Sequence, residues 1–435
     1  MRYFRPYSFL GVLCVIALAI PVLRRDQDWV TVYLPAAERL VSSGDIFANG
    51  SGFVYPPINA LLPLPFLAMS RTPGMLAWHA LNMLALGALI VGAWRLAGGP
   101  LLEGIRGISW REHAAFWLGL ACGISSCFDA ITNQQTDILV AALVILGCLA
   151  LSGQRDLRAA LCFGLAAALK CTPLLWAPYL AWRRRWLAAG LVGVAAVGFN
   201  FLPDVTHPAS DSSSRAVTWA SRFLMPMTES KADFGSWTCG IGGNQSVPGL
   251  CQRWLIYDTY WNGNELEGKY REGRASPEML KAVAWSAMFL LLAAAAVFAW
   301  RAPAETVAPP GQPATDSLHF GIILILMVLL SPHSSKPHFC TLLFPGFCVA
   351  RAALVGSRRG LLIVLIAAVA CALASNEDLV GEWLYSWSKW YGSLAGCALL
   401  LMAGSGYLLW MRGALSVDRA TDIRPFARPT GRRAA

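Results

Sequence analysis

The chain has 435 residues, of which 56% are hydrophobic and only 14% are charged, and its mean hydropathy is +0.51. Soluble globular domains carry about 25% charged residues, so this composition excludes an ordinary soluble protein and predicts a polytopic membrane protein. The net charge of +10 comes largely from arginines that border apolar segments. That placement is typical of cytoplasmic membrane anchors and excludes a nucleic-acid-binding surface.

The first apolar segment, residues 8–23, predicts a membrane span that begins in the cytoplasm, because Arg2 and Arg5 precede it. A cleaved signal peptide is the alternative for this segment. An uncleaved helix is favoured, since Pro21 and the pair Arg24–Arg25 follow at once and the chain continues as a membrane protein.

The next segment, DQDWVTVYLPAAERL at residues 26–40, places two acids at the edge of the membrane. Apolar residues recur in it at helical spacing, namely Val32, Ala36 and Leu40. This pattern predicts an amphipathic helix that lies on the outer leaflet. Asp28 would sit near its N-terminus, where the helix dipole favours a carboxylate. The structural alternative is that Asp28 only caps the helix or pairs with a nearby arginine.

Later apolar segments predict most of the remaining spans, because about 20 apolar residues cross a bilayer. Clear candidates lie near 75–97, 113–128, 137–151, 186–203, 281–300, 318–330, 339–355, 361–375 and 390–411. Two segments are harder to assign. Residues 56–70 are short and proline-rich, and residues 159–182 hold Lys170 and Pro173 in their middle.

The distribution of arginine and lysine sets the orientation. Basic residues at 183–185, at 357–360 and in the tail 412–435 place these segments in the cytoplasm. The first loop (24–57) and the long polar loop (204–280) then lie on the extracytoplasmic side, as does the short segment 331–338. The prediction is a single domain over residues 1–435 with about 12 crossings.

Two threadings of residues 56–182 remain open. In the first, 56–70 crosses fully and Lys170 lies at mid-membrane, so that Arg95 and Arg111 face outward against the charge bias. In the second, 56–70 enters the bilayer without crossing and 159–182 breaks near Lys170 into two short spans. The second is preferred because it places the arginines in the cytoplasm.

Ionisable groups at the membrane edge are energetically unfavourable, which makes each one a functional candidate. Lys170 interrupts an apolar run, so an anionic partner is expected. The segment NQQTD at 133–137 resembles a capped helix start, and its role can be purely structural.

Two further polar segments are predicted on the same face. In GGNQSVPGLCQRW (242–254), helix capping explains Asn244 and Ser246 but not Arg253, which is suited to clamp a phosphate. In SPHSSKPHF (331–339), the cluster of His333, Lys336 and His338 suits a phosphate or pyrophosphate. Metal binding is disfavoured, because Lys336 repels a cation and few carboxylates are near. The alternative for this segment is a solvated loop.

These stretches resemble, in the same order over nearly the whole chain, glycosyltransferase family 87. That family holds membrane enzymes of the GT-C class, including polyprenol-phosphate-mannose-dependent mannosyltransferases. The matching islands are DWVTVYLPAAERLVSSGDIF, FVYPPINALLPLPF, NQQTDILVAAL, LKCTPLLWAPYLAWRRRW, NQSVPGLCQR and SPHSSKPHF. The chain departs from the family pattern at Asn133, which replaces a glycine, at Ser335, which replaces a tryptophan, and at Pro337, which replaces a histidine.

The resemblance implies an all-α, GT-C-type bundle in the cytoplasmic membrane whose active site faces the extracytoplasmic side. It implies inverting transfer of a hexose, with mannose expected, from a polyprenyl-phosphate donor to a glycolipid or glycan acceptor, without a metal or other cofactor. Asp28 would be the catalytic base. The donor phosphate would bind Lys170, Arg253, His338 and Lys336. Other substrate contacts would come from Tyr33, Tyr55, Gln134, Asn244, Ser246 and His333.

Two alternatives stay open. One is transfer of another sugar, such as arabinofuranose, from a lipid-phosphate donor. The other is a lipid or polysaccharide transporter. A transporter needs polar groups along a path through both leaflets, whereas the ionisable residues here gather at one face, and this distribution favours an enzyme.

Overall fold

The computed structural model describes residues 27–100, 109–225, 243–271, 274–301 and 311–421. Regular structure in these ranges is helical apart from one antiparallel hairpin, formed by β1 (Tyr257–Asn262) and β2 (Glu265–Tyr270). The predicted all-α class is therefore confirmed. The predicted first span at 8–23 lies outside the described residues, as do Arg24, Arg25 and Asp26.

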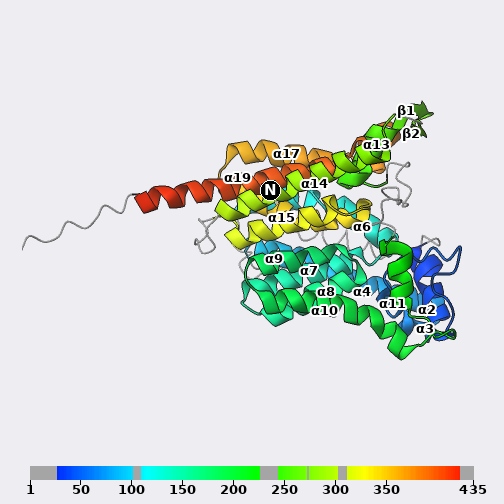
Figure 1. Ribbon diagram of the computed structural model, residues 1–435. Helices are drawn as coiled ribbons and strands as arrows, with labels where there is room; N and C mark the ends of the chain where they lie inside the picture. The colour runs from blue at the N-terminus through cyan, green and yellow to red at the C-terminus, as the bar shows by residue number, and fades with distance from the viewer. Residues whose placement is uncertain (1–26, 101–108, 226–242, 272–273, 302–310, 422–435) are drawn as a thin grey trace, which may run out of the picture.

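The long helices form two groups that lie side by side (Figure 1). The first group comprises α4 (Arg71–Leu96), α7 (Asp137–Ser152), α8 (Asp156–Leu169), α9 (Trp176–Trp182) and α10 (Trp186–Thr206). Helix α8 packs between α7 and α10, and α4 packs on α7. Helix α7 is apolar on nearly every face and is buried along most of its length, as expected for a helix inside a bundle.

The second group holds α14 (Pro277–Arg301), α15 (Thr315–Leu329), α16 (Leu343–Leu354), α17 (Arg359–Leu373) and α19 (Ser393–Thr421). Helix α5 (Trp110–Ala121) comes earlier in the chain but packs on α16, and α6 (Ile124–Thr132) packs on the short 3-10 helix η7 (Lys336–Leu342). Contacts of α4 with α16 and of α7 with η7 join the two groups into one bundle with a continuous apolar core.

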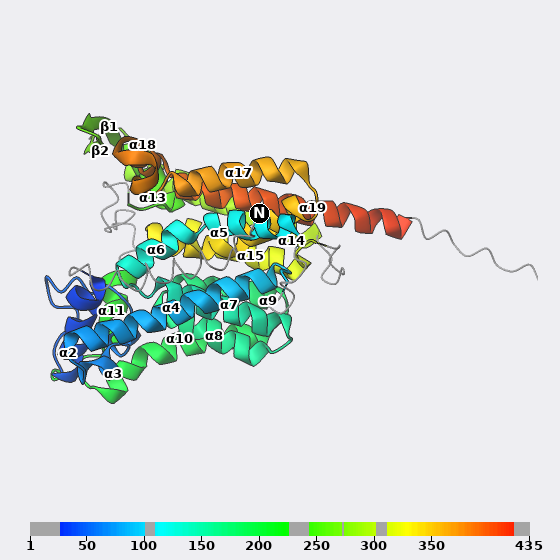
Figure 2. The same ribbon diagram turned by 180° about the vertical axis from the view of Figure 1, so that it is seen from behind.

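Short elements cover one end of the bundle, on the right in Figure 1 and on the left in Figure 2. They are η1 (Trp29–Tyr33), α2 (Leu34–Val41), η2 (Pro57–Ala60), α3 (Leu64–Leu67), α11 (Arg215–Trp219), η5 (Ala220–Leu224), α13 (Val247–Ile256), the hairpin and α18 (Glu377–Tyr391). The Trp219 indole donates to Val54 O at 3.1 Å, and Gln245 N donates to Ser334 O at 2.7 Å. The described parts of the first loop, the long polar loop and segment 331–338 therefore share one end, as predicted.

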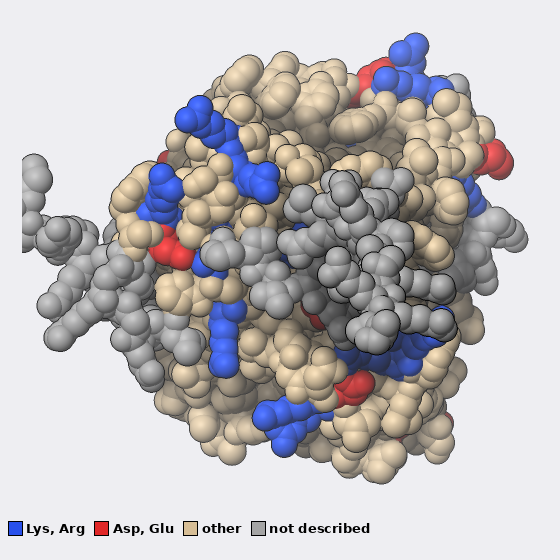
Figure 3. All heavy atoms as spheres, turned by 90° about the vertical axis from the view of Figure 1, so that its left-hand side faces the viewer, with Lys and Arg blue, Asp and Glu red and all other residues tan. Residues whose placement is uncertain are grey.

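The opposite end of the bundle is basic (Figure 3). Arg111 donates to Ser357 Oγ at 2.9 Å, and Arg95 is exposed in the last turn of α4. Arg183 pairs with Asp316 at 3.2 Å. The arginines that distinguish the two threadings thus gather beside segments 183–185 and 357–360, which is the arrangement of the second threading.

Residues 56–70 form no span, which also agrees with the second threading. The segment folds into η2 and α3, and α4 begins directly afterwards at Arg71. Prolines at both short helices fix the backbone but remove hydrogen-bond donors, so a long regular helix cannot form here.

The chain breaks at Lys170, as predicted. Helix α8 ends at Leu169, Lys170 is extended with φ −154° and ψ 122°, and η4 (Thr172–Leu175) leads into α9. Broken helices at membrane depth need other partners for their freed carbonyls. The Asn59 amide donates to Leu169 O at 2.9 Å, and the Asn200 amide donates to Ala168 O at 3.2 Å.

Five described helices are long and apolar enough to cross a membrane, or up to seven if two bent pairs count as single spans. The prediction of about 12 crossings is therefore not confirmed. Several of the expected spans are shorter than the roughly 20 residues that a bilayer requires. Helices α7 and α15, for example, have 16 and 15 residues.

The predicted helix in the first loop exists as η1 and α2, but its apolar face packs against protein instead of being open to lipid. The apolar side chains of this segment face the protein, and Tyr33, Ala36 and Leu40 are fully buried in a second apolar cluster with Trp29 and Trp78. The aromatic rings supply the reason, since Trp29 stacks on Trp78 of α4 at 4.4 Å. Burial against protein replaces burial against lipid.

The contact between α5 and α16 provides a test of the packing. A Cβ on Gly119 would lie 2.9 Å from the backbone of Phe347, whereas a Cβ on Gly190 of α10 would meet nothing within 4 Å. We expect Gly119→Leu to destabilise the protein by about 1–3 kcal/mol, because the two helices must separate. Thermal unfolding in detergent should show a lower Tm for Gly119→Leu and little change for the control Gly190→Leu. Equal Tm values for the two variants would contradict this packing.

Candidate functional site

A cavity of about 360 Å³ lies at the end of the bundle that carries the short elements. We call it the charged cavity. Its wall combines polar side chains with apolar ones, from the first loop, α7, the Lys170 break, α11, η5 and segment 331–338. The lining residues are Val54, Tyr55, Pro56, Gln135, Asp137, Lys170, Cys171, Thr172, Trp219, Phe223, Leu224, Ser331, Pro332, His333, Ser335 and His338.

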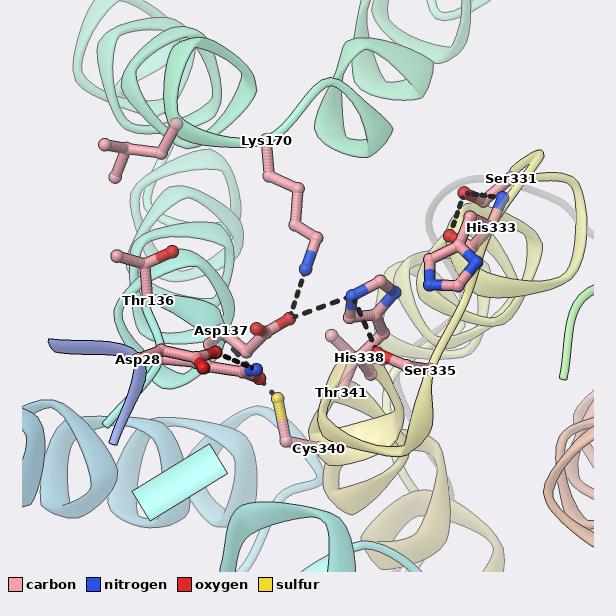
Figure 4. Close-up of polar contacts among 12 residues, drawn as sticks. Asp28, Thr136, Asp137, Lys170, Ser331, His333, Ser335, His338, Cys340 and Thr341 are labelled. Carbon is pink, nitrogen blue, oxygen red and sulfur yellow. Dashed lines mark hydrogen bonds and ion pairs between the residues drawn. The ribbon is translucent and has the colours of Figure 1, made fainter. Parts of the chain in front are cut away.

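An ion cluster forms the polar side of this cavity (Figure 4). Lys170 Nζ lies 2.6 Å from Asp137 Oδ1, and His338 Nε2 lies 3.7 Å from the same oxygen. The side chains of Asp137 and Lys170 are 5% and 17% exposed, so the pair is largely shielded from solvent. The anionic partner expected for Lys170 is therefore Asp137. From the sequence, Asp137 was expected only to cap the start of a helix.

The predicted residue His333 sits beside this cluster. Its ring centre lies 6.0 Å from that of His338, and its backbone is held by Ser331, whose Oγ donates to His333 O at 2.7 Å. Burial, reinforced by the charge of Lys170, lowers the pKa of His333 to about 4. The imidazole is therefore neutral at neutral pH and offers one donor and one acceptor nitrogen.

Asp28 lies next to the charged cavity and is tied to it through Gln135. The Gln135 amide donates to Asp28 Oδ2 at 2.6 Å, and Asp28 N donates to Asn133 O at 3.1 Å. Burial raises the pKa of the Asp28 carboxyl above its ordinary value, and the hydrogen bond from Gln135 opposes part of that rise. A partly buried carboxylate with a raised pKa is suited to accept a proton near neutral pH.

The two predicted tyrosines occupy different places. Their rings stack with centres 5.0 Å apart, but only Tyr55 lines the charged cavity. Burial keeps the pKa of Tyr55 well above its usual value, so its hydroxyl stays protonated and can donate. Tyr33 is fully buried behind it, with its hydroxyl 3.5 Å from Thr136 Oγ1.

Gln134 was predicted to bind substrate, but the structure brings Gln135 to the cavity instead. Gln134 is fully buried, and its backbone carbonyl accepts from the Trp78 indole at 3.0 Å. Its φ of 54° turns the chain at this point. The turn directs the next side chain, Gln135, toward Asp28.

Asn244 and Ser246 support the part of the cavity wall formed by segment 331–335. The Asn244 side chain donates to Pro332 O at 2.8 Å and accepts from Ser334 N at 2.9 Å. Ser246 Oγ accepts from Gly249 N at 3.3 Å, which confirms the predicted cap of α13. Neither residue lines the charged cavity. They fix segment 331–335, which carries His333.

Arg253 was predicted to bind the donor phosphate, and this position does not support that role. Its guanidinium is fully buried beneath the cavity wall. Nε donates to Trp390 O at 3.0 Å, and NH1 donates to Asn244 O. Arg253 therefore joins α13 to the end of α18 and supports Asn244, and it does not line the charged cavity.

Lys336 also lies outside the charged cavity. Its ammonium donates to Ser375 O at 2.7 Å and faces an adjoining cavity of about 290 Å³, which shares Gln135 and Ser335 with the first. Of the four residues predicted to bind phosphate, Lys170 and His338 both lie beside Asp137 and line the charged cavity. Lys336 and Arg253 do not line it. Within the described ranges no group of three or more His, Cys, Asp or Glu side chains is placed to hold a metal ion.

The Lys170–Asp137 pair should stabilise the site measurably. Removing one partner of a buried ion pair destabilises a protein by about 3–5 kcal/mol, because the other charge stays buried alone. We expect Lys170→Met to lower the Tm in detergent strongly and the double variant Lys170→Met/Asp137→Asn to recover much of the loss. The matched control is Lys269→Met, which removes an exposed lysine from β2. A double variant less stable than Lys170→Met alone would contradict the pairing.

Comparison with known proteins identifies the family. The family model of glycosyltransferase family 87 matches residues 53–332, more than half of the chain. This range includes Tyr55, Gln135, Asp137 and Lys170, and it excludes Asp28 and His338. Searches of curated proteins and of solved structures gave no match. The ordered islands, the helical membrane fold and the family match lead to one conclusion: the chain is a membrane glycosyltransferase that belongs to glycosyltransferase family 87.

Proposed function

We propose that the protein transfers a hexose, with mannose expected, from a polyprenyl-phosphate sugar to a glycolipid or glycan acceptor. The observation that carries the proposal is the placement of Asp28 next to a cavity with both a cation and an apolar wall. Lys170 and His338 supply the polar side of this cavity, and Asp28 is held beside it by Gln135. A lipid-linked sugar phosphate needs a cation to bind its phosphate and an apolar surface to bind its lipid chain.

The donor phosphate would bind at Lys170. An ammonium group has three donors, and one of them is used by Asp137, so two can reach a phosphate oxygen. His338 lies on the same carboxylate and can donate from its ring. These groups would stabilise the negative charge that develops on the leaving lipid phosphate.

The isoprenoid chain would lie along the apolar part of the same cavity. Trp219, Phe223 and Leu224 form this part of the wall. They come from α11 and η5, at the end of α10, one of the helices long enough to cross a membrane. The lipid chain would then reach this wall from the bilayer along α10.

Asp28 would act as the general base. The acceptor hydroxyl oxygen attacks the anomeric carbon, its proton passes to the Asp28 carboxylate, and the bond from carbon to the phosphate oxygen breaks with its electron pair on the lipid phosphate. Attack opposite to the leaving group inverts the configuration. A second carboxylate is not needed, unlike in hydrolysis by a carboxylate pair, because the phosphate is already a good leaving group.

The reaction would occur on the extracytoplasmic side. The support is the charge asymmetry. The arginine-rich end of the bundle (Figure 3) is the end opposite the short elements, which include α11 of the cavity wall (Figure 1), and positively charged ends face the cytoplasm. A lipid-borne donor and a headgroup or glycan acceptor would then meet at the outer membrane surface.

Loss of the base should slow transfer strongly. We expect Asp28→Asn to reduce transfer from radiolabelled polyprenyl-phosphate-mannose in membranes by about 10²–10⁴-fold, the usual contribution of a general base. The control Glu38→Gln removes an exposed carboxylate from α2 and should leave the rate unchanged. Undiminished transfer by Asp28→Asn would remove Asp28 as the base, and no transfer by the unmodified protein would remove the proposed donor.

The hydrogen bond from Gln135 should be visible in the pH dependence. It lowers the pKa of Asp28 against the effect of burial, so Gln135→Leu should raise that pKa further. The base must be deprotonated to act, so we expect the acid limb of kcat/KM to move to higher pH. The Glu38→Gln variant should keep the original profile. An acid limb that stays in place or moves to lower pH would contradict this role for Gln135.

A further inference from the structure

The adjoining cavity that Lys336 faces has no part in the donor site described above. It occupies about 290 Å³ and touches the charged cavity at two residues, Gln135 and Ser335, which line both. We call it the polar cavity. Its walls come from α6, the turn after it, η7, α18 and the first residues of α19.

The two cavities differ in chemistry. The charged cavity has a broad apolar side that includes Trp219, Phe223 and Leu224. In the polar cavity nearly every lining side chain carries a hydrogen-bonding group, and Leu394 is the one large aliphatic residue in the lining. Hydroxyl-rich molecules can form hydrogen bonds with such a wall, whereas an isoprenoid chain gains little from contact with polar side chains.

Charged and aromatic groups are arranged around this space in a way that suits a sugar. Lys389 Nζ lies 5.5 Å from the centre of the Tyr385 ring, and both side chains are only partly buried. Asp129 approaches from α6, and Lys336 approaches from η7. A carboxylate and an ammonium can accept from and donate to sugar hydroxyls, and the face of a tyrosine ring can pack against a pyranose.

We infer that the polar cavity is the acceptor site and that it takes a glycosyl or polyol group, the hydroxyl-bearing part of the acceptor. This inference rests on the proposed function, since it requires a donor in the charged cavity. The shared wall at Gln135 explains how the two substrates meet. Gln135 faces both cavities and also holds Asp28, so a hydroxyl presented from the polar cavity arrives on the side where the base is held.

Ser335, in the segment 331–338, also lines both cavities. Its Oγ lies 3.3 Å from His338 Nε2, the nitrogen that faces Asp137. A bulky residue at this position would narrow the path along which the acceptor oxygen reaches the donor.

The inference is tested by the separate effects of cavity variants on the two substrates. The full-length protein in lipid nanodiscs is given radiolabelled polyprenyl-phosphate-mannose and the total glycolipid extract of the membranes in which the protein occurs. Mild acid then destroys unused donor but spares the glycosidic product. We expect Asp129→Asn and Lys389→Met each to raise the apparent KM for the extract about tenfold, because each weakens a polar contact with the acceptor, and a tenfold change corresponds to about 1.4 kcal/mol. The KM for the donor should stay within about twofold of its original value.

Two further variants serve as controls for the acceptor and donor KM values. Phe223→Ala, in the charged cavity, should raise the donor KM and leave the acceptor KM unchanged. Lys269→Met, on the exposed face of β2, should change neither. Thermal unfolding of each preparation confirms that the partly buried Lys389 can be replaced in a folded protein.

The possible failures are distinguishable. If Asp129→Asn and Lys389→Met raise the donor KM, or alter neither KM in a folded protein, the polar cavity is not the acceptor site even though transfer occurs. If the unmodified protein transfers nothing from this donor, the proposed function itself fails, and the acceptor site falls with it.

Discussion

The pairing of Lys170 with Asp137 is the interaction on which the site depends. A lysine in an apolar helix is strongly unfavourable unless a partner neutralises it. Asp137 provides that partner from the first residue of α7, at 2.6 Å, and α8 ends at Leu169, the residue before Lys170. The pair therefore fixes both the place where α8 stops and the way α7 begins, and it brings His338 of η7 to the same carboxylate.

The break at Lys170 has a second support that belongs to the fold. Because α8 ends early, its last carbonyls need partners from outside the helix. The side-chain amides of Asn59 and Asn200 donate to the carbonyls of Leu169 and Ala168. Asn59 belongs to the proline-rich segment 56–70, and Asn200 belongs to α10. Their hydrogen bonds tie the proline-rich segment and α10 to the end of the broken helix. Pro56 of this segment and Lys170 at the break both line the charged cavity.

Much of this arrangement was predictable from local sequence, and the remainder was not, for physical reasons. Hydropathy and arginine placement predict the helical class, the basic end and the polar end, since these depend on the bilayer alone. Lys170 and Pro173 predict the break. The partner Asp137 is 33 positions away, and no local pattern distinguishes it from a helix start. The turn at Gln134, with φ 54°, exchanges the roles of two adjacent glutamines. Arg253 has the chemistry of a phosphate ligand, but α13 directs it into the protein toward Trp390 O and Asn244 O.

The central claim is that the charged cavity holds the lipid-phosphate donor, with its phosphate at Lys170 and its chain along Trp219 and Phe223. Photolabelling with a polyprenyl-phosphate-mannose whose isoprenoid carries a diazirine tests this most directly. The account predicts labelled peptides from residues 215–225, with labelling suppressed by excess polyprenyl phosphate and reduced in Lys170→Met. Specific labelling confined to the separate groove between α2, α3 and α4, which is lined by Trp29 and Phe66, would contradict it.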